Sequence, residues 1–171
     1  MKPLVQAGDV FGTENPMALG RAINAVQRFW SHDHESTYSH TGTILDSKGT
    51  TFEALWTCKR QNLFEAYAGK QVIIARFVGN PKCEMGFALD TVVKNFDGCR
   101  YPIWRVPMHL FPPLARINLF HKPVCSEMTA FYEWILGARH EHWSGANPDV
   151  LTDEWRNWDA WAVVGEGKLD G

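Results

Sequence analysis

The chain has 171 residues, of which 45% are hydrophobic and 21% are charged, and its formal net charge is −2. This length suits one well-filled core, so we expect a single domain over residues 1–171. Scattered charges of both signs exclude the basic surface that nucleic-acid binding needs. No apolar run reaches the ~18 residues of a membrane span. We therefore expect neither a nucleic-acid partner nor integral membrane contact.

The N-terminus and the cysteines bear on the compartment. Residues 1–9 lack the apolar stretch of a secretory signal, which predicts a chain that is cytoplasmic as synthesised. The cysteines have neither paired metal-type spacing nor a dense disulfide pattern, so we expect free thiols, no cofactor and no metal. They are Cys58, Cys83, Cys99 and Cys125.

The first third of the chain predicts strands around a helix. Residues 8–12 are typical of a short strand, and residues 15–30 of a helix capped by Asn15. Residues 37–45 and 50–56 alternate as a hairpin around the turn 46–49. A turn centred on residues 47–48 sets Gly42 opposite Glu53, which makes Glu53 the diagonal neighbour of His40 on the same face, at ~7–8 Å between backbones. Gly42 leaves room for the carboxylate to lean toward the imidazole.

The rest of the chain predicts a strand over 71–78, a helix between Pro81 and Gly98, and a proline-rich irregular stretch over 101–121. A short helix capped by Thr152 and a strand over 161–164 follow. We expect the tryptophans at 155, 158 and 161 to form one aromatic face of a helix, in preference to a platform for sugars or a membrane interface.

Cys125 stands where an extended segment turns into a helix. Pro123 cannot lie inside a helix, whereas apolar residues recur with helical spacing from Ser126 to Leu136, before Gly137. Cys125 therefore falls on the first turn. There the helix dipole and unpaired N–H groups stabilise a thiolate, which is a good nucleophile. The alternative is that Cys125 packs as a small hydrophobic residue.

Three separate elements thus offer a nucleophile (Cys125), a base (His40) and an orienting carboxylate (Glu53), the set that nucleophilic catalysis needs. With them in view, the chain resembles the circularly permuted NlpC-type papain-like cysteine hydrolases, the YaeF/YiiX group. The motifs that carry this resemblance are Gly8-Asp9-Val10, Tyr38-Ser39-His40-Thr41-Gly42, Phe52-Glu53-Ala54, Cys125-Ser126-Glu127-Met128 and Asn147-Pro148-Asp149-Val150-Leu151. The histidine precedes the cysteine, as in the permuted group.

The resemblance implies an α+β, papain-like fold with a central antiparallel sheet packed against helices. It implies Cys125 as nucleophile, His40 as base, Glu53 as third member and Tyr101 as an oxyanion donor, beside the Cys125 N–H that the helix start provides. The expected activity is a thiol peptidase or amidase that forms an acyl-enzyme thioester, with peptidoglycan peptides as the suggested substrate. Such a protein would reach the wall by export, lysis or association with a virion.

Two alternatives stay open at this point. The same cysteine and histidine serve lipid acyl hydrolases and acyltransferases, which would need an acyl slot; Phe111, Leu114 and Leu119 are the candidates. A catalytically silent binding module would keep the fold alone.

Some polar residues have competing interpretations. The His-x-His pairs at 32–34 and 140–142 lack companions at zinc spacing, so we expect solvated loops. Asp9 is a second candidate carboxylate, although its place after Gly8 suits a turn.

Overall fold

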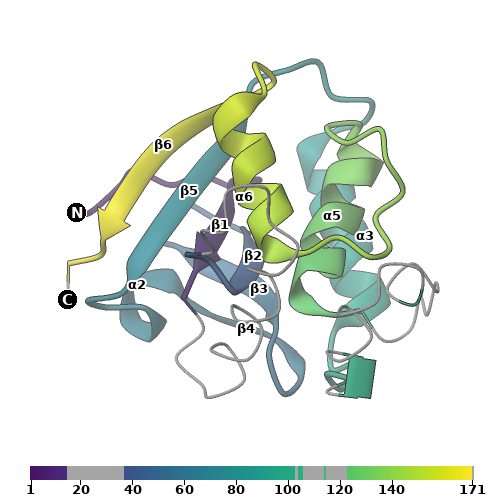
Figure 1. Ribbon diagram of the computed structural model, residues 1–171, viewed down its shortest axis with the longest axis horizontal. Coiled ribbons are helices and arrows are strands. Elements are labelled where there is room, and N and C mark those ends of the chain that lie inside the picture. Colours follow the sequence, from purple (N-terminus) through teal and green to yellow (C-terminus); the bar gives the residue numbers. More distant parts are fainter. Residues whose placement is uncertain (15–36, 103, 106–113, 115–122, 171) are drawn as a thin grey trace.

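A six-stranded antiparallel sheet forms the centre of the protein (Figure 1). The computed structural model describes residues 1–14, 37–102, 104–105, 114 and 123–170, so the helix expected over 15–30 and most of the proline-rich stretch lie outside the described residues. The strand order is β4-β3-β2-β1-β5-β6, and every neighbouring pair is antiparallel. The strands are β1 (Val10–Thr13), β2 (His40–Ile44), β3 (Thr50–Ala54), β4 (Cys58–Asn62), β5 (Gln71–Phe77) and β6 (Trp161–Lys168).

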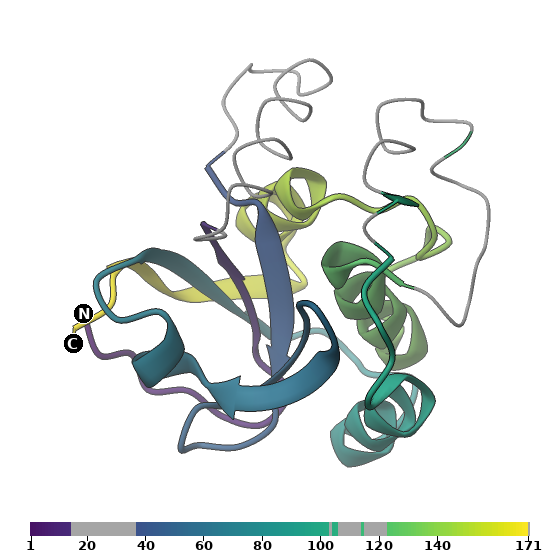
Figure 2. The same cartoon turned by 90° about the horizontal axis from the view of Figure 1, so that it is seen from below.

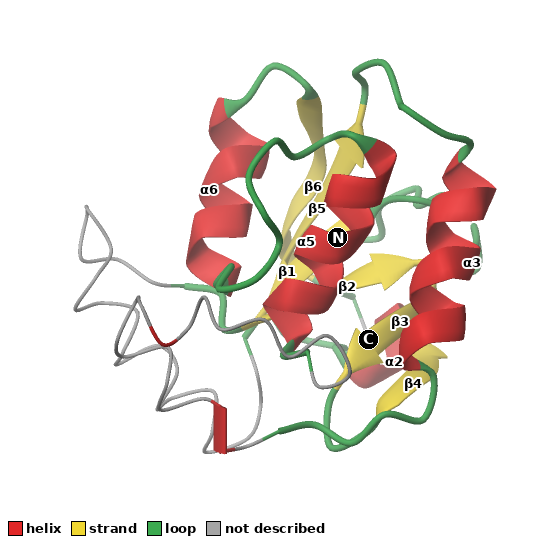
Figure 3. Ribbon diagram, turned by 90° about the vertical axis from the view of Figure 1, so that its right-hand side faces the viewer, coloured by secondary structure: helices red, strands yellow, loops and turns green. Residues whose placement is uncertain are grey.

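Helices cover both faces of this sheet. On one face, α3 (Met85–Phe96), α5 (Cys125–Leu136) and α6 (Pro148–Asn157) lie side by side (Figure 3). The short α2 (Leu63–Ala66) lies on the other face (Figure 2). Because both faces are covered, residues 72–75 of β5 are all buried: Ile73 and Ala75 pack in the core under the three helices, while Val72 and Ile74 pack in a second core on the α2 side. The protein therefore has the α+β class that the sequence predicted.

The hairpin of β2 and β3 has the predicted register. Thr43 pairs with Phe52 and Ile44 with Thr51, which sets Gly42 opposite Glu53. The turn is fixed locally, because the Asp46 carboxylate accepts hydrogen bonds from the N–H groups of residues 48 and 50 at 2.9 and 3.0 Å. Gly49 takes a positive φ of 82° there.

Helix α5 begins and ends where the sequence predicted. Val124 is its N-cap, Cys125 its first residue, and Gly137 ends it with a left-handed φ of 81°. The Glu127 carboxylate accepts the Val124 N–H at 3.1 Å and pairs with the buried guanidinium of Arg105. These contacts fix the first turn of α5.

Other elements differ from the expectations. The last helix begins at Pro148, because Asn147 caps it by accepting the Val150 N–H at 2.9 Å, whereas the predicted cap Thr152 lies inside it. The prediction of one tryptophan face is wrong: α6 ends at Asn157, so Trp158 follows the helix and Trp161 opens β6. That strand continues to residue 168. Strand β4 and helix α2 were not predicted.

Candidate active site

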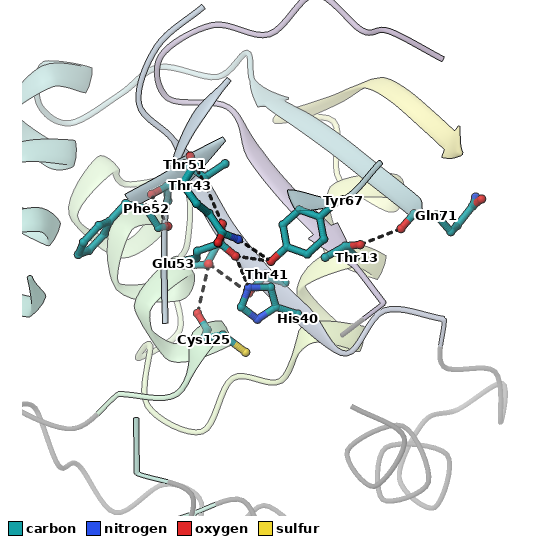
Figure 4. Close-up of polar contacts among 12 residues, drawn as sticks. Thr13, His40, Thr41, Thr43, Thr51, Phe52, Glu53, Tyr67, Gln71 and Cys125 are labelled. Atoms are coloured by element: carbon teal, nitrogen blue, oxygen red, sulfur yellow. Dashed lines mark hydrogen bonds and ion pairs between the residues drawn. The ribbon is translucent and has the colours of Figure 1, made fainter. Parts of the chain in front are cut away.

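The Cys125 side chain is 2% exposed and points toward His40 (Figure 4). The first turn of α5 places it there. The Ser126 N–H donates a hydrogen bond to the sulfur, as expected at a helix start, where backbone N–H groups have no partner within the helix.

A further donor comes from the point where β2 and β3 separate. If the pairing of β2 with β3 continued two residues past Thr43 and Phe52, Thr41 would lie opposite Ala54, and its N–H would form a hydrogen bond with β3. Instead β3 stays with β4, and the Thr41 N–H donates to the Cys125 sulfur. The hydroxyl of Thr129 on α5 also bonds that of Thr41, at 3.1 Å. The splayed hairpin therefore supplies a backbone donor to the thiol.

His40 and Glu53 form the buried pair that the hairpin register predicted. The imidazole Nε2 lies 2.7 Å from Oε2 of Glu53, and the two side chains are 1% and 0% exposed. Gly42 makes this contact possible, since a Cβ at residue 42 would lie 3.0 Å from the Cβ of Glu53 and 2.7 Å from the Phe11 ring. With Nε2 bonded to Glu53, Nδ1 is the ring nitrogen left for Cys125, with which the imidazole also interacts.

The Glu53 carboxylate has two further donors. The Thr51 hydroxyl donates to Oε1 at 2.5 Å, and the Tyr67 hydroxyl donates to Oε2. We did not predict either contact. Thr51 lies two residues before Glu53 and so shares its strand face, a signal that was available. Tyr67 follows α2, whose packing onto the hairpin left no pattern in the sequence.

Charges in this site stabilise one another against burial. Burial alone would raise the pKa of Cys125, but the His40 imidazolium and the N–H groups of residues 41 and 126 outweigh it and lower that pKa. Burial would likewise lower the pKa of His40, yet the Cys125 thiolate and Glu53 raise it to about 10. The pKa of Glu53 is lowered, because hydrogen bonds from His40, Thr51 and Tyr67 outweigh its burial. A thiolate beside an imidazolium is therefore the favoured state near neutral pH.

Tyr101, expected beside the cysteine, does lie there. Its hydroxyl hydrogen-bonds the Cys125 sulfur and accepts the Cys125 N–H. Burial and the nearby thiolate raise the pKa of this phenol, which keeps it protonated. The backbone places the ring, since the Tyr101 N–H donates to the Trp56 carbonyl at 2.9 Å, beside the start of β4.

The other candidate residues have different surroundings. Asp9 is buried in a two-point ion pair with Arg76, at 2.8 and 2.9 Å, which is a structural contact. The rings of His140 and His142 pack against different tryptophans, Trp158 and Trp143, and so do not converge.

All four cysteines are free thiols. Leu114 is 44% exposed, whereas Phe111, Leu119 and the histidines at 32 and 34 lie outside the described residues.

Comparisons with known proteins agree with this architecture. No family model matches the chain, and no curated protein matches it. Among solved structures, the chain is similar to the metalloprotein YiiX from Escherichia coli O157:H7, with a TM-score of 0.58 and 21% sequence identity. The match covers 98% of this chain and 89% of that one. The chain shares the YiiX fold. At this identity the likeness concerns the fold, which fits a papain-like α+β architecture.

Proposed function

We propose that this protein is a cysteine hydrolase of the permuted NlpC-type papain-like group, which cleaves an amide bond through an acyl-enzyme thioester. One observation carries the proposal: a buried Cys125 thiol at a helix start interacts with His40, whose other ring nitrogen is bonded to the buried Glu53. Isolated core cysteines have neither a base nor a charge partner, so simple packing does not account for this arrangement.

The reaction follows from these contacts. The Cys125 thiolate attacks the amide carbonyl carbon, and the His40 imidazolium, through Nδ1, protonates the amine that leaves. The now neutral His40 then takes a proton from water, which attacks the thioester. The acid product leaves, and the thiolate and imidazolium are restored. Glu53 keeps the ring in one orientation and stabilises its positive charge throughout.

The tetrahedral oxyanion has two donors close to the sulfur. The Cys125 N–H lies at the positive end of α5 and at present donates to the Tyr101 hydroxyl. A carbonyl oxygen that takes this N–H also lies beside the phenol, which can turn its proton from the sulfur to the oxyanion. Donors already placed at this position stabilise developing charge without reorganisation.

Cell-wall peptides are the substrate class that we propose, on the resemblance of the motifs and their order. The chain order of histidine, acid and cysteine matches the permuted arrangement. The acyltransferase alternative places a second histidine on the strand that follows the first, and here that position on β3 holds Glu53. The contact between Glu53 and His40 therefore favours the amide hydrolase.

The proposal includes no metal, although YiiX is described as a metalloprotein. Among the residues that the structure describes, no group of three or more His, Cys, Asp or Glu side chains is placed to hold a metal ion. At the site itself, donors occupy both oxygens of Glu53, which leaves Cys125 and His40 as two ligands. Zinc sites use three or four protein ligands. These residues do not fit a metal, and no step passes through one.

Incubation with soluble cell-wall peptides, followed by mass analysis of products and of the intact protein, tests the proposal. We expect new amine termini and a transient acyl adduct on Cys125. Cys125→Ala should abolish both, whereas Cys83→Ala should retain them, because Cys83 bonds the Ile135 carbonyl away from His40. Turnover by Cys125→Ala would overturn the proposal. Release of fatty acid from phospholipid, with wall peptides untouched, would show the acyl hydrolase instead.

A further inference from the structure

The Tyr67 hydroxyl and the imidazole of His40, the proposed base, both form hydrogen bonds with the carboxylate of Glu53. We propose that Tyr67 is a positioning residue of this site, whose hydroxyl fixes the oxygen of Glu53 that faces His40 and stabilises the charge on that carboxylate. This inference rests on the proposed thiolate mechanism and adds a fourth member behind the cysteine, histidine and glutamate.

The fold brings Tyr67 to the site from the α2 side of the sheet. Asn62 caps α2, and the Tyr67 N–H, at the end of that helix, donates to the Leu63 carbonyl at 3.0 Å. The ring then lies 5.7 Å from that of Phe11 and 6.2 Å from that of His40, between centroids. The side chain is 2% exposed. Tyr67 thus packs against the imidazole as well as bonding its partner.

The direction of the Tyr67 hydrogen bond is set by a second contact. The Gln61 side-chain amide donates to the Tyr67 oxygen at 3.2 Å, so the single hydroxyl proton is directed to Glu53. Burial and the charge of Glu53 raise the pKa of the phenol, which keeps that proton in place. Tyr67 is therefore a permanent, oriented donor to the carboxylate.

Thr51 cannot replace this donor. Its hydroxyl donates to the other oxygen, Oε1, and the hydroxyl oxygen also lies 3.2 Å from the backbone carbonyl oxygen of Gln61, which competes for its one proton. Tyr67 and His40 share Oε2, so Tyr67 decides where the oxygen that the imidazole needs will lie.

The consequence reaches the sulfur through the charge of Glu53. An ionised Glu53 favours the thiolate and imidazolium, whereas a protonated one lets the proton return from His40 to Cys125. Without the Tyr67 donor, the buried Glu53 takes up a proton at higher pH, and the reactive thiolate is lost at that pH instead of a lower one. A residue that only filled space would change stability and leave this pH dependence alone.

The test is the pH profile of Cys125 alkylation by iodoacetamide, followed by peptide mass in the wild type and in Tyr67→Phe. We expect the acid-side midpoint to rise by about one pH unit. A hydrogen bond to a charged group stabilises that group by at least about 1.5 kcal/mol, and about 1.4 kcal/mol corresponds to one pKa unit. The rate above the midpoint should stay within about twofold of wild type, since Glu53 is ionised there in both proteins. Tyr132→Phe is the matched control: it also removes a buried hydroxyl, bonded to the Gly8 carbonyl at 2.9 Å, and should leave the midpoint unchanged.

An unchanged midpoint in Tyr67→Phe, or an equal rise in Tyr132→Phe, would overturn the inference while the proposed function stands. Gln61→Leu keeps the tyrosine in place but removes the amide that orients its proton, so it should raise the midpoint by a smaller amount. If Tyr67→Phe does not fold, this second variant decides. If the midpoint of Cys125 alkylation in the wild type is as high as the midpoint for Cys83, the proposed function is overturned, and this inference with it.

Discussion

Replacing Glu53 by glutamine removes the charge next to His40 while keeping the shape of the side chain. The carboxylate lies 2.7 Å from Nε2, and both groups are buried. A hydrogen bond to a buried charged group is worth ~1.5–3 kcal/mol, and one pKa unit corresponds to about 1.4 kcal/mol. The pKa of His40, raised to about 10 in the wild type, should therefore fall to about 8–9 in Glu53→Gln.

Stability should also change in this variant. In the wild type, Thr51 and Tyr67 donate to Oε1 and Oε2 respectively. A glutamine turns an NH₂ group toward one of these donors, so at least one buried hydrogen bond is lost. The free energy of unfolding should fall by about 1–3 kcal/mol, and the protein should keep part of its activity because the Cys125 nucleophile remains.

NMR titration of the labelled imidazole, assigned with His40→Gln, measures the first effect, and urea unfolding the second. Asp9→Asn is the matched control, since Asp9 is another fully buried carboxylate, paired with Arg76. It should lower stability while the pKa of His40 stays at about 10. An unchanged pKa of His40 in Glu53→Gln would refute the assignment of Glu53 as its charge partner.

Two further predictions concern packing and pH. In Gly42→Ala the added Cβ would meet the Phe11 ring at 2.7 Å and the Glu53 Cβ at 3.0 Å, so stability should fall by about 1–3 kcal/mol and alkylation of Cys125 should slow; normal values for both would contradict the packing argument. The second is the stability that His40 and Cys125 contribute, measured as the difference in unfolding free energy from their double alanine variant. In the unfolded chain a thiol of pKa 9.0 and an imidazole of pKa 6.5 hold one proton between these values. The folded pair also holds one, so the difference should be flat from about pH 6.5 to 9 and fall on both sides. A steady slope across this window would contradict the ion pair.

The hairpin shows what the sequence could predict. Register in a hairpin follows from its turn, and the turn over residues 46–49 carried its own signals in Asp46 and Gly49. Once Thr43 and Phe52 were paired, the period of two placed His40 and Glu53 on one face, as observed. Helix α5 was equally predictable from Pro123 and Gly137.

Elements without an apolar pattern were missed. Strand β4 reads Cys58-Lys59-Arg60-Gln61-Asn62 and lies at the sheet edge, where lysine and arginine face solvent and the alternation of burial is weak. Helix α2 has four residues, too few for a helical period to be seen.

The donors to the site were hidden for a related reason. The Thr41 N–H reaches Cys125 because β2 and β3 part on the His40 side of Thr43, where the pairing of the two strands ends. Tyr67 reaches Glu53 through tertiary packing alone. Contacts of this kind leave no pattern in the local sequence, whereas the turn and the helix ends that place His40, Glu53 and Cys125 did leave one.

The sequence predicts no contact with a membrane through a spanning segment. Within the described ranges of the chain, none of the helices has the length and apolar character to cross a membrane.

Competitive alkylation of the four cysteines at pH 6 tests the central claim, that Cys125 is a thiolate paired with His40. Exposure alone ranks Cys125 low, since it is 2% exposed while Cys83 and Cys99 are partly exposed. An ordinary thiol is only ~0.3% ionised at pH 6, so ionisation ranks Cys125 first. We predict that iodoacetamide labels Cys125 at least about tenfold faster than the other cysteines, and that His40→Ala removes this preference. Labelling that follows exposure instead, with Cys125 no faster than Cys83, would contradict the account.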